Sequence, residues 1–574
     1  MTRFWFGWLA LPVLVGCCGG IAQAQQTPTP SQVAPPAVAP APTTPTRIVL
    51  PRIEAGGKVP AQAKKLFFTL TGVDVKGEFP ELVAQRQALA EPLIGKRISV
   101  AQVFELAAQL QALYVRAGYP LVRVVITPQE LDKAARVKLN VVDGFIERVD
   151  AGAIDGLVRS RVLAVVGALV NQRHLTQAAL ERKLLIAGEA PGLVLNAIFA
   201  AGKQVGGAVL ILTGRYRPVS VSLYGDNAMP AVFGGSQLVA SASLNGVLGL
   251  GERLTVSAAG FPDENFTTAD PTRRYLSVAL SVPLGTDGWS VDGGVTLGRT
   301  TPQVALTVAS QGKLTQSYAR LSYEAIKRRD VELTFRGRFE ATDEEVDSLL
   351  FSPALPLSLD RMRVLRGSVE GLWRLRASGT VISYGTTLSQ GLDAFGARTA
   401  DDATFTLPLS RAGADAVFTK LQGHATVTQS LPEDLFVTLA GFAQTSFNKP
   451  LLTSEQFDIV GAQMLSGYDA GSFAGDSAWV TRAELGRNIV LPKSPVVLTP
   501  YLFAATGERL LEQPSVLELA SVHASNFGLG LRYAITSTDD FPVNVSGFVE
   551  GSRQNSDDPT QDGWRLFVGG VASY

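Results

Sequence analysis

From Tyr216 to Tyr574, apolar and polar side chains alternate with a period of two. In the stretch 289–297, one face carries Trp, Val, Gly, Val and Leu, while the other carries Ser, Asp, Gly and Thr. The same alternation occurs at 254–259 and 276–282. This period predicts strands that have one apolar and one wet face. Because a soluble sandwich alternates in the same way, the pattern alone does not decide between a sandwich and a membrane barrel.

Two shorter units with mixed periodicity precede these strands. Residues 64–143 are predicted to form a strand, two helices and two strands, and residues 144–214 repeat this order. In the second helix of the first unit, apolar residues recur at intervals of three and four and so share one face: Val103, Leu106, Leu110 and Leu113. We therefore predict two small α+β domains in front of the strand-rich part.

The strand-rich part, residues 215–574, is too long for one sandwich. Strands of about 10 residues with loops of about 12 would divide it into roughly 16 strands, an even number that allows closure. The last strand ends on Tyr574 after alternating apolar positions. This ending looks like the signal that barrel-insertion machinery reads. The predicted fold is mainly β: two α+β domains, then a transmembrane antiparallel β-barrel of about 16 strands.

The N-terminus has the order of a secretory signal. The apolar stretch 4–16 follows Arg3, and Ala22-Gln23-Ala24 supplies small residues for cleavage, so residues 1–24 are predicted to be a signal peptide. An alternative is a lipoprotein signal ending at Cys17, which would then be acylated. Both cysteines lie in this segment, so the mature chain would have no disulfide.

Residues 25–63 contain a dense run of prolines, through which no helix can continue. We expect an extended periplasmic linker there, and a passive spacer is favoured over a binding segment.

Composition narrows the class of protein. Charged residues make up 18% of the chain, and acids and bases cancel at 51 each, which argues against nucleic acid as a partner. Mean hydropathy is positive at +0.18. No apolar run of about 18 residues follows the signal, so a helical membrane protein is disfavoured. A slightly apolar chain without spanning helices is typical of a transmembrane barrel.

Several motifs, in order along the chain, resemble those of a known family. They are Gly118-Tyr119, Pro128-Gln129 and Gly144 in the first unit, Leu180-Glu181-Arg182 and Pro191-Gly192 in the second, and Tyr224-Gly225-Asp226-Asn227 and 245–252 at the start of the barrel. From about Leu66 to Tyr574 the chain resembles the two-partner secretion transporters, the hemolysin secretion/activation family of the BamA/TpsB superfamily. The resemblance implies that 64–143 and 144–214 are POTRA domains 1 and 2.

The most specific stretch, 451–487, resembles the loop that folds back into the barrel lumen in this family. Its motif residues here are Leu465, Ser466, Gly467, Tyr468, Gly475 and Asp476. The family places an Arg at position 466, paired with an Asp at the position of Ala505. Removing one partner of a buried ion pair costs about 3 to 5 kcal/mol, whereas replacing both partners can be nearly neutral. The loss of both the Arg at 466 and the Asp at 505 is therefore physically reasonable.

With that pair absent, we expect the loop to remain tucked into the lumen, although less tightly than in the family. Packing of Tyr468, close approach at a glycine and backbone hydrogen bonds would hold it. How the substitutions at Ser466 and Ala505 affect gating is left open.

The family implies a function without cofactor or catalysis. The POTRA domains would capture an unfolded secreted passenger polypeptide by strand addition, and the barrel would export it. The protein would lie in the outer membrane of a Gram-negative cell, in contact with the lipid bilayer, with its N-terminal part in the periplasm. During biogenesis the barrel-assembly machinery would be a partner, and nucleic acid would not.

Other functions fit less well. An outer-membrane protein assembly factor of the same superfamily is the main alternative, although it would favour more POTRA domains and an intact Arg-Gly-aromatic motif. A plain porin would need no periplasmic modules, and a non-transporting member of the family stays open. An enzyme is disfavoured because the mature chain would lack cysteine and the histidines are scattered: His174, His424 and His523.

Two groups of charged residues are interpreted as solvated rather than functional. Glu455, Asp476 and Glu484 are taken as solvated lumen or loop carboxylates. The run 327–330 is taken as a solvated strand end that faces lipopolysaccharide or the lumen.

Overall fold

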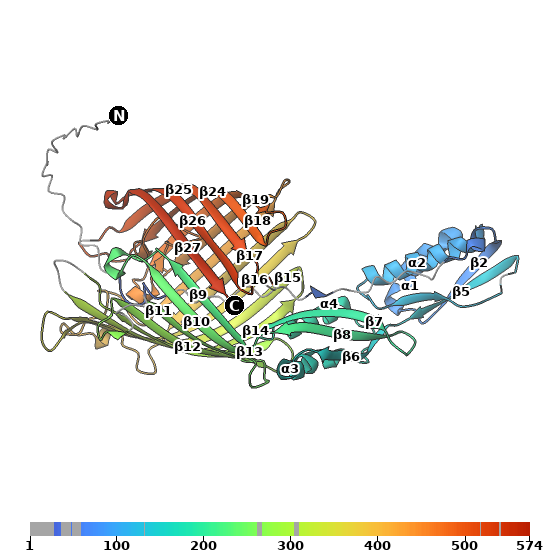
Figure 1. Ribbon diagram of the computed structural model, residues 1–574, viewed down its shortest axis with the longest axis horizontal. Helices are drawn as coiled ribbons and strands as arrows, with labels where there is room; N and C mark the ends of the chain where they lie inside the picture. The colour runs from blue at the N-terminus through green and yellow to red at the C-terminus, as the bar shows by residue number, and fades with distance from the viewer. Residues whose placement is uncertain are drawn as a thin grey trace, which may run out of the picture.

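The computed structural model describes residues 28–35, 47–48, 59–130, 132–260, 267–303, 309–516, 518–538 and 541–574. Two α+β units extend from one end of a large barrel (Figure 1). The fold class predicted from the sequence is confirmed. The predicted signal peptide, including Cys17, lies outside the described residues.

The first unit contains a four-stranded sheet of order β3-β2-β5-β4. Its elements are β2 (Phe67–Lys76), α1 (Val83–Ala90), β3 (Arg97–Ser99), α2 (Val100–Arg116), β4 (Arg123–Ile126) and β5 (Ala134–Val142). The side chain of Ser99 caps α2 and forms a capping box with Gln102. The predicted apolar face of α2 is buried against the sheet at Val103, Leu106 and Leu110.

The second unit repeats this plan with a sheet of order β1-β7-β8-β6. Its elements are β6 (Phe145–Ala153), α3 (Gly156–Val166), α4 (Gln177–Gly188), β7 (Leu193–Ala201) and β8 (Gly207–Tyr216). The remaining strand, β1 (Arg47–Ile48), comes from the proline-rich stretch and pairs in parallel with β7. The free edge of β7 is therefore partly covered by the chain's own N-terminal segment.

Sixteen antiparallel strands close the barrel. They are β9 (Val219–Asp226), β10 (Gln237–Asn245), β11 (Arg253–Gly260), β12 (Arg273–Leu284), β13 (Trp289–Thr300), β14 (Ser310–Lys327), β15 (Val331–Ser348), β16 (Leu355–Leu375), β17 (Thr380–Gly391), β18 (Thr419–Ser430), β19 (Leu435–Thr445), β22 (Ser477–Arg487), β24 (Val496–Leu510), β25 (Ser521–Ile535), β26 (Asn544–Ser556) and β27 (Gly563–Ser573). A short β23 (Ile489–Val490) extends the pairing with β24. Closure occurs where β27 pairs with β9, over the short register from Gly569↔Asp226 to Ser573↔Ser222. We call this pairing the seam.

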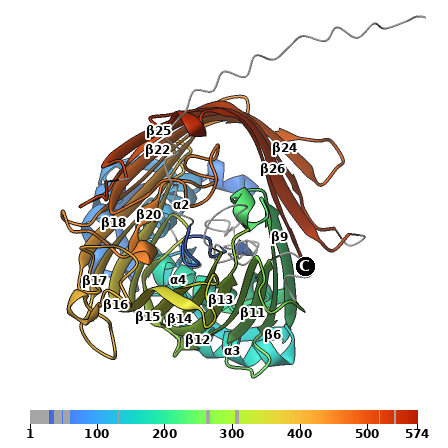
Figure 2. The same cartoon turned by 90° about the vertical axis from the view of Figure 1, so that its left-hand side faces the viewer.

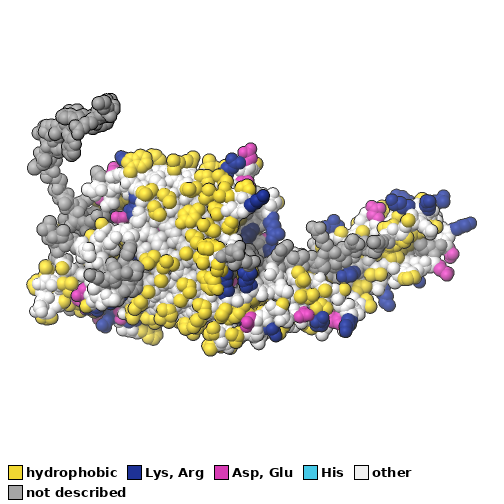
Figure 3. Space-filling model, in the orientation of Figure 1, with side chains coloured by type: hydrophobic (Ala, Val, Ile, Leu, Met, Phe, Trp, Pro, Cys, Tyr) yellow, Lys and Arg dark blue, Asp and Glu magenta, His cyan; other side chains and the backbone are white. Residues whose placement is uncertain are grey.

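Period-two alternation sorts the barrel side chains between two environments. Outward positions carry exposed apolar residues such as Leu276, Leu297 and Leu529. Apolar side chains form yellow areas over the outer wall of the barrel in Figure 3. Their inward neighbours include buried charged residues such as Arg273 and Asp292. An apolar exterior around a polar interior is the pattern of a barrel that faces lipid. Across the described ranges, the structure contains no helix long and apolar enough to span a membrane.

The lumen is occupied, as the view along the barrel shows (Figure 2). Part of its content is the segment 28–35, which the sequence analysis placed in an extended periplasmic linker. Here the amide of Ser31 donates to Glu344 at 2.9 Å and its hydroxyl does so at 2.8 Å. Arg273 Nε donates to the carbonyl of Val33 at 2.8 Å. Proline density excluded a long helix but not one hydrogen-bonded turn, so a spacer is the wrong description of these residues.

Candidate functional site

The chain between β19 and β22, residues 446–476, folds back into the barrel, and we call it the lumen loop. Two short strands, β20 (Phe457–Asp458) and β21 (Ala474–Gly475), pair and close it on itself. The half-buried carboxylate of Asp458 accepts hydrogen bonds from the amides of Gly471 at 2.6 Å and Phe473 at 3.2 Å. The loop is thus braced internally before it touches the wall.

Asp476 anchors the base of the lumen loop, where the loop joins β22. Its carboxylate is completely buried and accepts Arg411 Nη1 at 2.6 Å. It also accepts the amides of Leu451 at 3.0 Å and Glu512 at 2.7 Å. One carboxylate therefore joins the two ends of the lumen loop to the loops that contain Arg411 and Glu512. Gly475 lies beside it, where a Cβ atom would come within 2.9 Å of the Leu510 carbonyl.

Glu455 provides a second charged anchor near the base. Arg366 on β16 donates to both of its carboxylate oxygens, at 2.7 and 3.1 Å. Lys420 on β18 approaches the same carboxylate at 2.9 Å and is itself buried. These ion pairs cross from the loop to two wall strands.

The tip of the lumen loop is held mainly by neutral groups. Tyr468 is 1% exposed, and its hydroxyl lies 2.9 Å from the Ser525 carbonyl and 3.0 Å from the Asn555 carbonyl. Gly467 packs so closely that an added Cβ would lie 2.9 Å from Asn526 Nδ2 and from Ser552 Oγ. The expected tucked position thus has a visible steric cause: the residue at 467 must be very small.

Ser466 makes the central polar contact of the tip. Its hydroxyl donates to Glu550 Oε2 at 2.5 Å and accepts from Arg482 Nη1 at 2.8 Å. Arg482, on β22, is 2% exposed and is bound to Glu550 at 2.7 Å and to Glu484 at 2.7 Å. A guanidinium group therefore lies at the loop tip, as in the family, but it belongs to Arg482 on the barrel wall and not to the loop.

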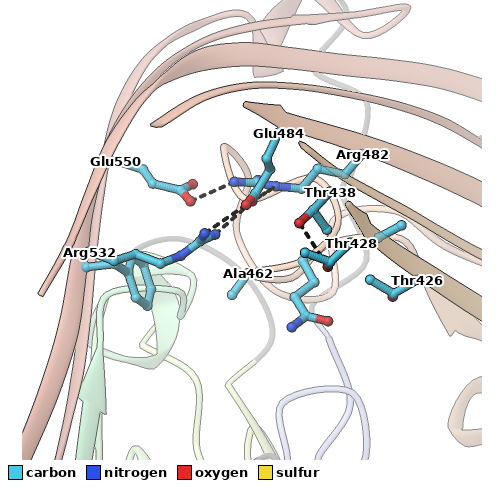
Figure 4. Close-up of a pocket in the computed structure, with 11 residues that line it drawn as sticks. Thr426, Thr428, Thr438, Ala462, Arg482, Glu484, Arg532 and Glu550 are labelled. Carbon is cyan, nitrogen blue, oxygen red and sulfur yellow. Dashed lines mark hydrogen bonds and ion pairs between the residues drawn. The ribbon is translucent and has the colours of Figure 1, made fainter. Parts of the chain in front are cut away.

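The charges around Ser466 form a closed set on the wall, which we call the wall charge network: Arg482, Glu484, Arg532 and Glu550. Arg532 donates to both oxygens of Glu484, at 2.8 and 2.7 Å, and Tyr501 donates to Glu550 at 2.6 Å. Figure 4 shows these side chains beside a cavity of about 340 Å³. Two cations and two anions balance, so the loop contributes no charge to the network.

The small side chain of Ala505 explains why Arg482, a cation that comes from the wall, fits at the loop tip. Ala505 lies directly opposite Arg482 in the β22–β24 register. It is 5% exposed and belongs to the same apolar cluster as Tyr468 and Val480. An Asp at position 505 would therefore lie next to Arg482, where the guanidinium already has two carboxylate partners. The position is apolar here, and Glu550 takes over as the partner of the cation at the loop tip.

The interpretation of Glu455, Asp476 and Glu484 as solvated carboxylates is wrong, since all are buried and ion-paired. Sequence reasoning also missed Arg482 and Glu550. Arg482 has an inward-facing spacing of two from Glu484 within Arg482-Ala483-Glu484-Leu485, a signal that could have identified it. Glu550 belongs to a strand with no motif, and only the fold brings it close.

The tip of the lumen loop also reaches the seam. Asp469 forms an ion pair with Arg565 at the start of β27. Arg565 also donates to the carbonyl of Asn227, just beyond β9, at 2.6 Å. The side chain of Asn227 bridges to β27, donating to the Leu566 carbonyl at 2.8 Å and accepting the Val568 amide at 2.8 Å. The loop therefore touches the junction of the first and last strands.

At the other end of the seam lies the predicted insertion signal, Tyr574. Its carbonyl and amide bond the backbone of Val221 on β9, at 3.2 and 2.9 Å. Its ring lies 4.7 Å from the Arg217 guanidinium, at the junction of the second unit and the barrel. The terminal aromatic residue thus closes the barrel as well as ending the chain.

The motif residues of the first unit build its joint with the second. Gly118 takes a left-handed conformation, φ 94°, after α2. The ring of Tyr119 packs edge-on against Phe79, and its hydroxyl donates to Glu81 at 2.8 Å, which raises the pKa of the phenol. Phe79 in turn stacks on His174 of the second unit at 4.1 Å. His174 is exposed, and it also forms a contact between the two units.

The remaining motif residues shape the end of the same sheet. Gln129, next to Pro128, substitutes for a strand partner: it accepts the amide of Lys138 at 2.8 Å and donates to its carbonyl at 3.0 Å. A Cβ on Gly144 would lie 2.0 Å from the Leu121 carbonyl, so only glycine fits. These residues have structural roles, and none faces a cavity described for the structure.

The second unit is fixed to the barrel by ion pairs along α4. Lys183 binds Asp287 at 2.5 Å, and Arg329 binds Glu181 at 3.5 Å. Lys327 pairs with Glu189 at the end of α4. The run 327–330 was interpreted as a solvated strand end that faces lipopolysaccharide or the lumen, and this holds only in part. Arg328 and Asp330 are solvent-exposed and pair with each other, whereas Lys327 and Arg329 dock on the second unit.

Comparison with known proteins identifies the two parts. Residues 206–532 match the family described as haemolysin secretion/activation protein ShlB/FhaC/HecB, and residues 68–144 match the ShlB-type POTRA domain. The heme/hemopexin transporter protein HuxB of Haemophilus influenzae strain 86-028NP is 22% identical over 515 residues, covering 86% of each chain.

Among solved structures, CdiB from Escherichia coli superposes with a TM-score of 0.69 at 17% identity, covering 93% of this chain and 94% of the other. CdiB from Acinetobacter baumannii gives 0.56 at 15% identity, with 89% and 90% covered. These likenesses establish a shared fold.

Proposed function

This chain belongs to the haemolysin secretion/activation family of two-partner secretion transporters, and on that premise we propose how its parts divide the work of export. It transports a partner protein across the outer membrane. In our proposal, residues 64–143 and 144–214 are POTRA domains that project into the periplasm and capture the unfolded passenger. The barrel, residues 215–574, is the channel, and residues 1–24 are the signal peptide that is removed.

The observation that carries this proposal is the lumen loop. A channel that must stay closed until a partner arrives needs an internal obstruction that can move without unfolding the wall. The lumen loop is braced by Asp458 within itself, and its tip meets a wall charge network that is already neutral. Segment 28–35 adds a second occupant of the lumen. Both must shift before an extended polypeptide can pass.

Capture would use strand addition at a POTRA sheet edge, where backbone hydrogen bonds supply affinity. In the first domain, β4 forms an edge next to β5. In the second, the edge strand β7 is partly paired with β1. A passenger strand would therefore either add at β4 or displace residues 47–48 from β7. Because the periplasm offers no nucleotide, folding of the passenger outside the cell would supply the free energy for export.

The test is secretion of the protein encoded next to this gene, compared between the intact strain and a strain that lacks this chain. Loss of the neighbour from the culture medium, with its accumulation or degradation in the periplasm, is the expected outcome. Unchanged secretion together with failed assembly of other outer-membrane barrels would instead establish the alternative, an assembly factor of the same superfamily. Levels of an unrelated outer-membrane porin serve as the control in both strains.

A further inference from the structure

We infer that the second POTRA domain rests against the outer membrane through an apolar surface that contacts phospholipid of the inner leaflet. Two segments form this surface, which we call the rim patch: the outward residues of α3 and the turn between β10 and β11, residues 246–251. The inference rests on the orientation proposed above, in which the POTRA domains lie in the periplasm.

Helix α3 is apolar on its outward face as well as on its inward face. The inward valines are buried in the core of the domain. The outward face is exposed and carries no charged residue: Leu157, Ser160, Leu163 and Ala164. A helix at the surface of a water-soluble domain normally carries charged or polar residues on that face. The outward face of α3 is therefore suited to an apolar environment.

The two charged residues of α3 are held on its flanks by carbonyl groups. Arg159 Nε donates to the carbonyl of Ile154, just before the helix, at 2.9 Å. Arg161 donates to the carbonyl of Gly285, in the turn between β12 and β13. Arg161 therefore leaves the outward face uncharged and also fixes α3 to the rim of the barrel.

The turn between β10 and β11 presents leucine side chains beside α3. Leu248 is 73% exposed and Leu250 is 58% exposed. The buried carboxylate of Glu252 sets the shape of the turn, because it accepts the amides of Leu248 at 2.7 Å and Leu250 at 3.1 Å. Gly249 lies against the start of α3, where a Cβ atom would come within 3.6 Å of the Leu157 carbonyl. The motif 245–252 thus builds a braced turn with apolar outward residues.

The rim patch continues the lipid-facing surface of the barrel. Leu284, an exposed apolar residue, ends β12 directly before the turn that Arg161 binds. Trp289 follows the same turn and stacks on Tyr323 of β14 at 4.4 Å. Aromatic residues that flank the apolar band of a barrel lie at the membrane interface. Helix α3 is therefore attached at the height of that interface.

The position of α3 relative to the wall favours lipid over the passenger as the occupant. In the view along the barrel, α3 is visible beyond the outer edge of the wall next to β12, whereas α4 lies behind the opening (Figure 2). A passenger must enter that opening, on the side of α4. Lipid surrounds the wall where α3 extends beyond it. Large exposed apolar patches mark contact surfaces, and here the inner leaflet is the apolar phase that continues from the barrel.

The experiment measures the depth of single spin labels in the full-length protein, reconstituted in nanodiscs of phosphatidylethanolamine and phosphatidylglycerol. Both cysteines lie in the predicted signal peptide, so Leu248→Cys and Leu163→Cys each supply one labelling site in the mature chain. Val205→Cys is the matched control, since Val205 is an exposed apolar residue of the same domain, in the turn between β7 and β8. Electron paramagnetic resonance compares relaxation by oxygen, which concentrates among acyl chains, with relaxation by a water-soluble nickel chelate.

We expect the labels at 248 and 163 to lie about 5 Å below the lipid phosphates, with high access to oxygen and low access to nickel. The label at 205 should be fully accessible to nickel. Access to nickel at 248 and 163 that equals access at 205 would overturn the contact. Protection that arises only after the purified passenger is added would assign the rim patch to the passenger, and dipolar broadening between labels would assign it to a second copy; either result overturns lipid as the occupant.

This result is independent of the test of export. The depths are measured without a passenger, whereas export is scored by secretion in the deletion strain. Embedded labels together with unchanged secretion would leave the lipid contact standing and reject export. Water-exposed labels together with lost secretion would reject only the lipid contact.

Discussion

The base and the tip of the lumen loop are attached to the same barrel by different chemistry. At the base, buried charges pair across segments: Asp476 with Arg411, and Glu455 with Arg366 and Lys420. At the tip, the hydroxyl of Ser466 is hydrogen-bonded to the wall charge network, which is neutral on its own. If the base moved away from the barrel wall, a buried charge would lose its partner or become exposed. If the tip moved away, the ions of the wall would remain paired with one another.

This difference suggests which part of the loop moves. Separating a buried ion pair strands an uncompensated charge and costs several kcal/mol. A hydrogen bond contributes about 1 kcal/mol net between neutral groups and about 1.5 to 3 kcal/mol to a charged group, as at Ser466. A passenger that displaces the loop would therefore lift the tip first and pivot on Asp476. The ion pair Asp469–Arg565 is the exception at the tip, and it is partly exposed.

The largest expected effect comes from breaking the base with Asp476→Ala. Arg411 would remain buried without its carboxylate, and the amides of Leu451 and Glu512 would lose their acceptor. We expect a loss of about 3 to 5 kcal/mol in the free energy of unfolding. A shift of the thermal unfolding midpoint of the purified barrel measures it. Glu508→Gln, which removes an outward carboxylate, is the control; equal shifts for both would contradict the assignment of the base.

A second change reverses the chemistry of the tip. Ser466→Arg would place a guanidinium against that of Arg482, which lies 2.8 Å from the serine hydroxyl. The repulsion should expel the tip, with a cost of about 2 to 4 kcal/mol, and raise single-channel conductance and its fluctuations. Ala505→Asp added to Ser466→Arg should restore the closed state in part, because position 505 lies opposite Arg482. Conductance of the single variant that equals that of Ser466→Ala would refute the repulsion.

The barrel and its lumen loop also show how much of the fold and of the site the sequence could predict. Alternation, length and the terminal aromatic residue predicted the barrel, and mixed periodicity predicted the two α+β units, because period and spacing are local properties. The loop inside the lumen was implied only by the resemblance of residues 451–487 to the family. The sequence also predicted a weakened tip from the joint loss at positions 466 and 505. It could not reveal that Glu550, from β26, reaches Ser466, since that contact depends on barrel closure. Segment 28–35 shows the same limit, because its partners Arg273 and Glu344 lie far along the chain.

A third, smaller change probes the neutral attachment of the tip directly. Tyr468→Phe keeps the ring packed against Phe473 but removes the hydroxyl that bonds the backbone at Ser525 and Asn555. We expect a destabilisation of about 1 to 2 kcal/mol, with brief openings rather than a permanently open channel. Planar-bilayer recordings distinguish the two. Tyr533→Phe on the outward face of β25 is the control and should leave the recordings unchanged.

The smallest effect is expected at the contact between the tip and the seam. Arg565→Gln removes the ion pair with Asp469 and weakens the bond to the Asn227 carbonyl, but the glutamine can still donate one hydrogen bond. Because Asp469 is 39% exposed, solvent screens the pair, and the cost should be about 0.5 to 1 kcal/mol. A disulfide-trapping assay between Asn227→Cys and Leu566→Cys, with and without Arg565→Gln, reports on the seam. Slower trapping in the triple variant would mean that the loop tip helps to hold the first and last strands together. An unchanged rate would mean that the backbone pairing of β27 with β9 closes the seam without help from the tip, and the tip would then be free to move without opening the wall.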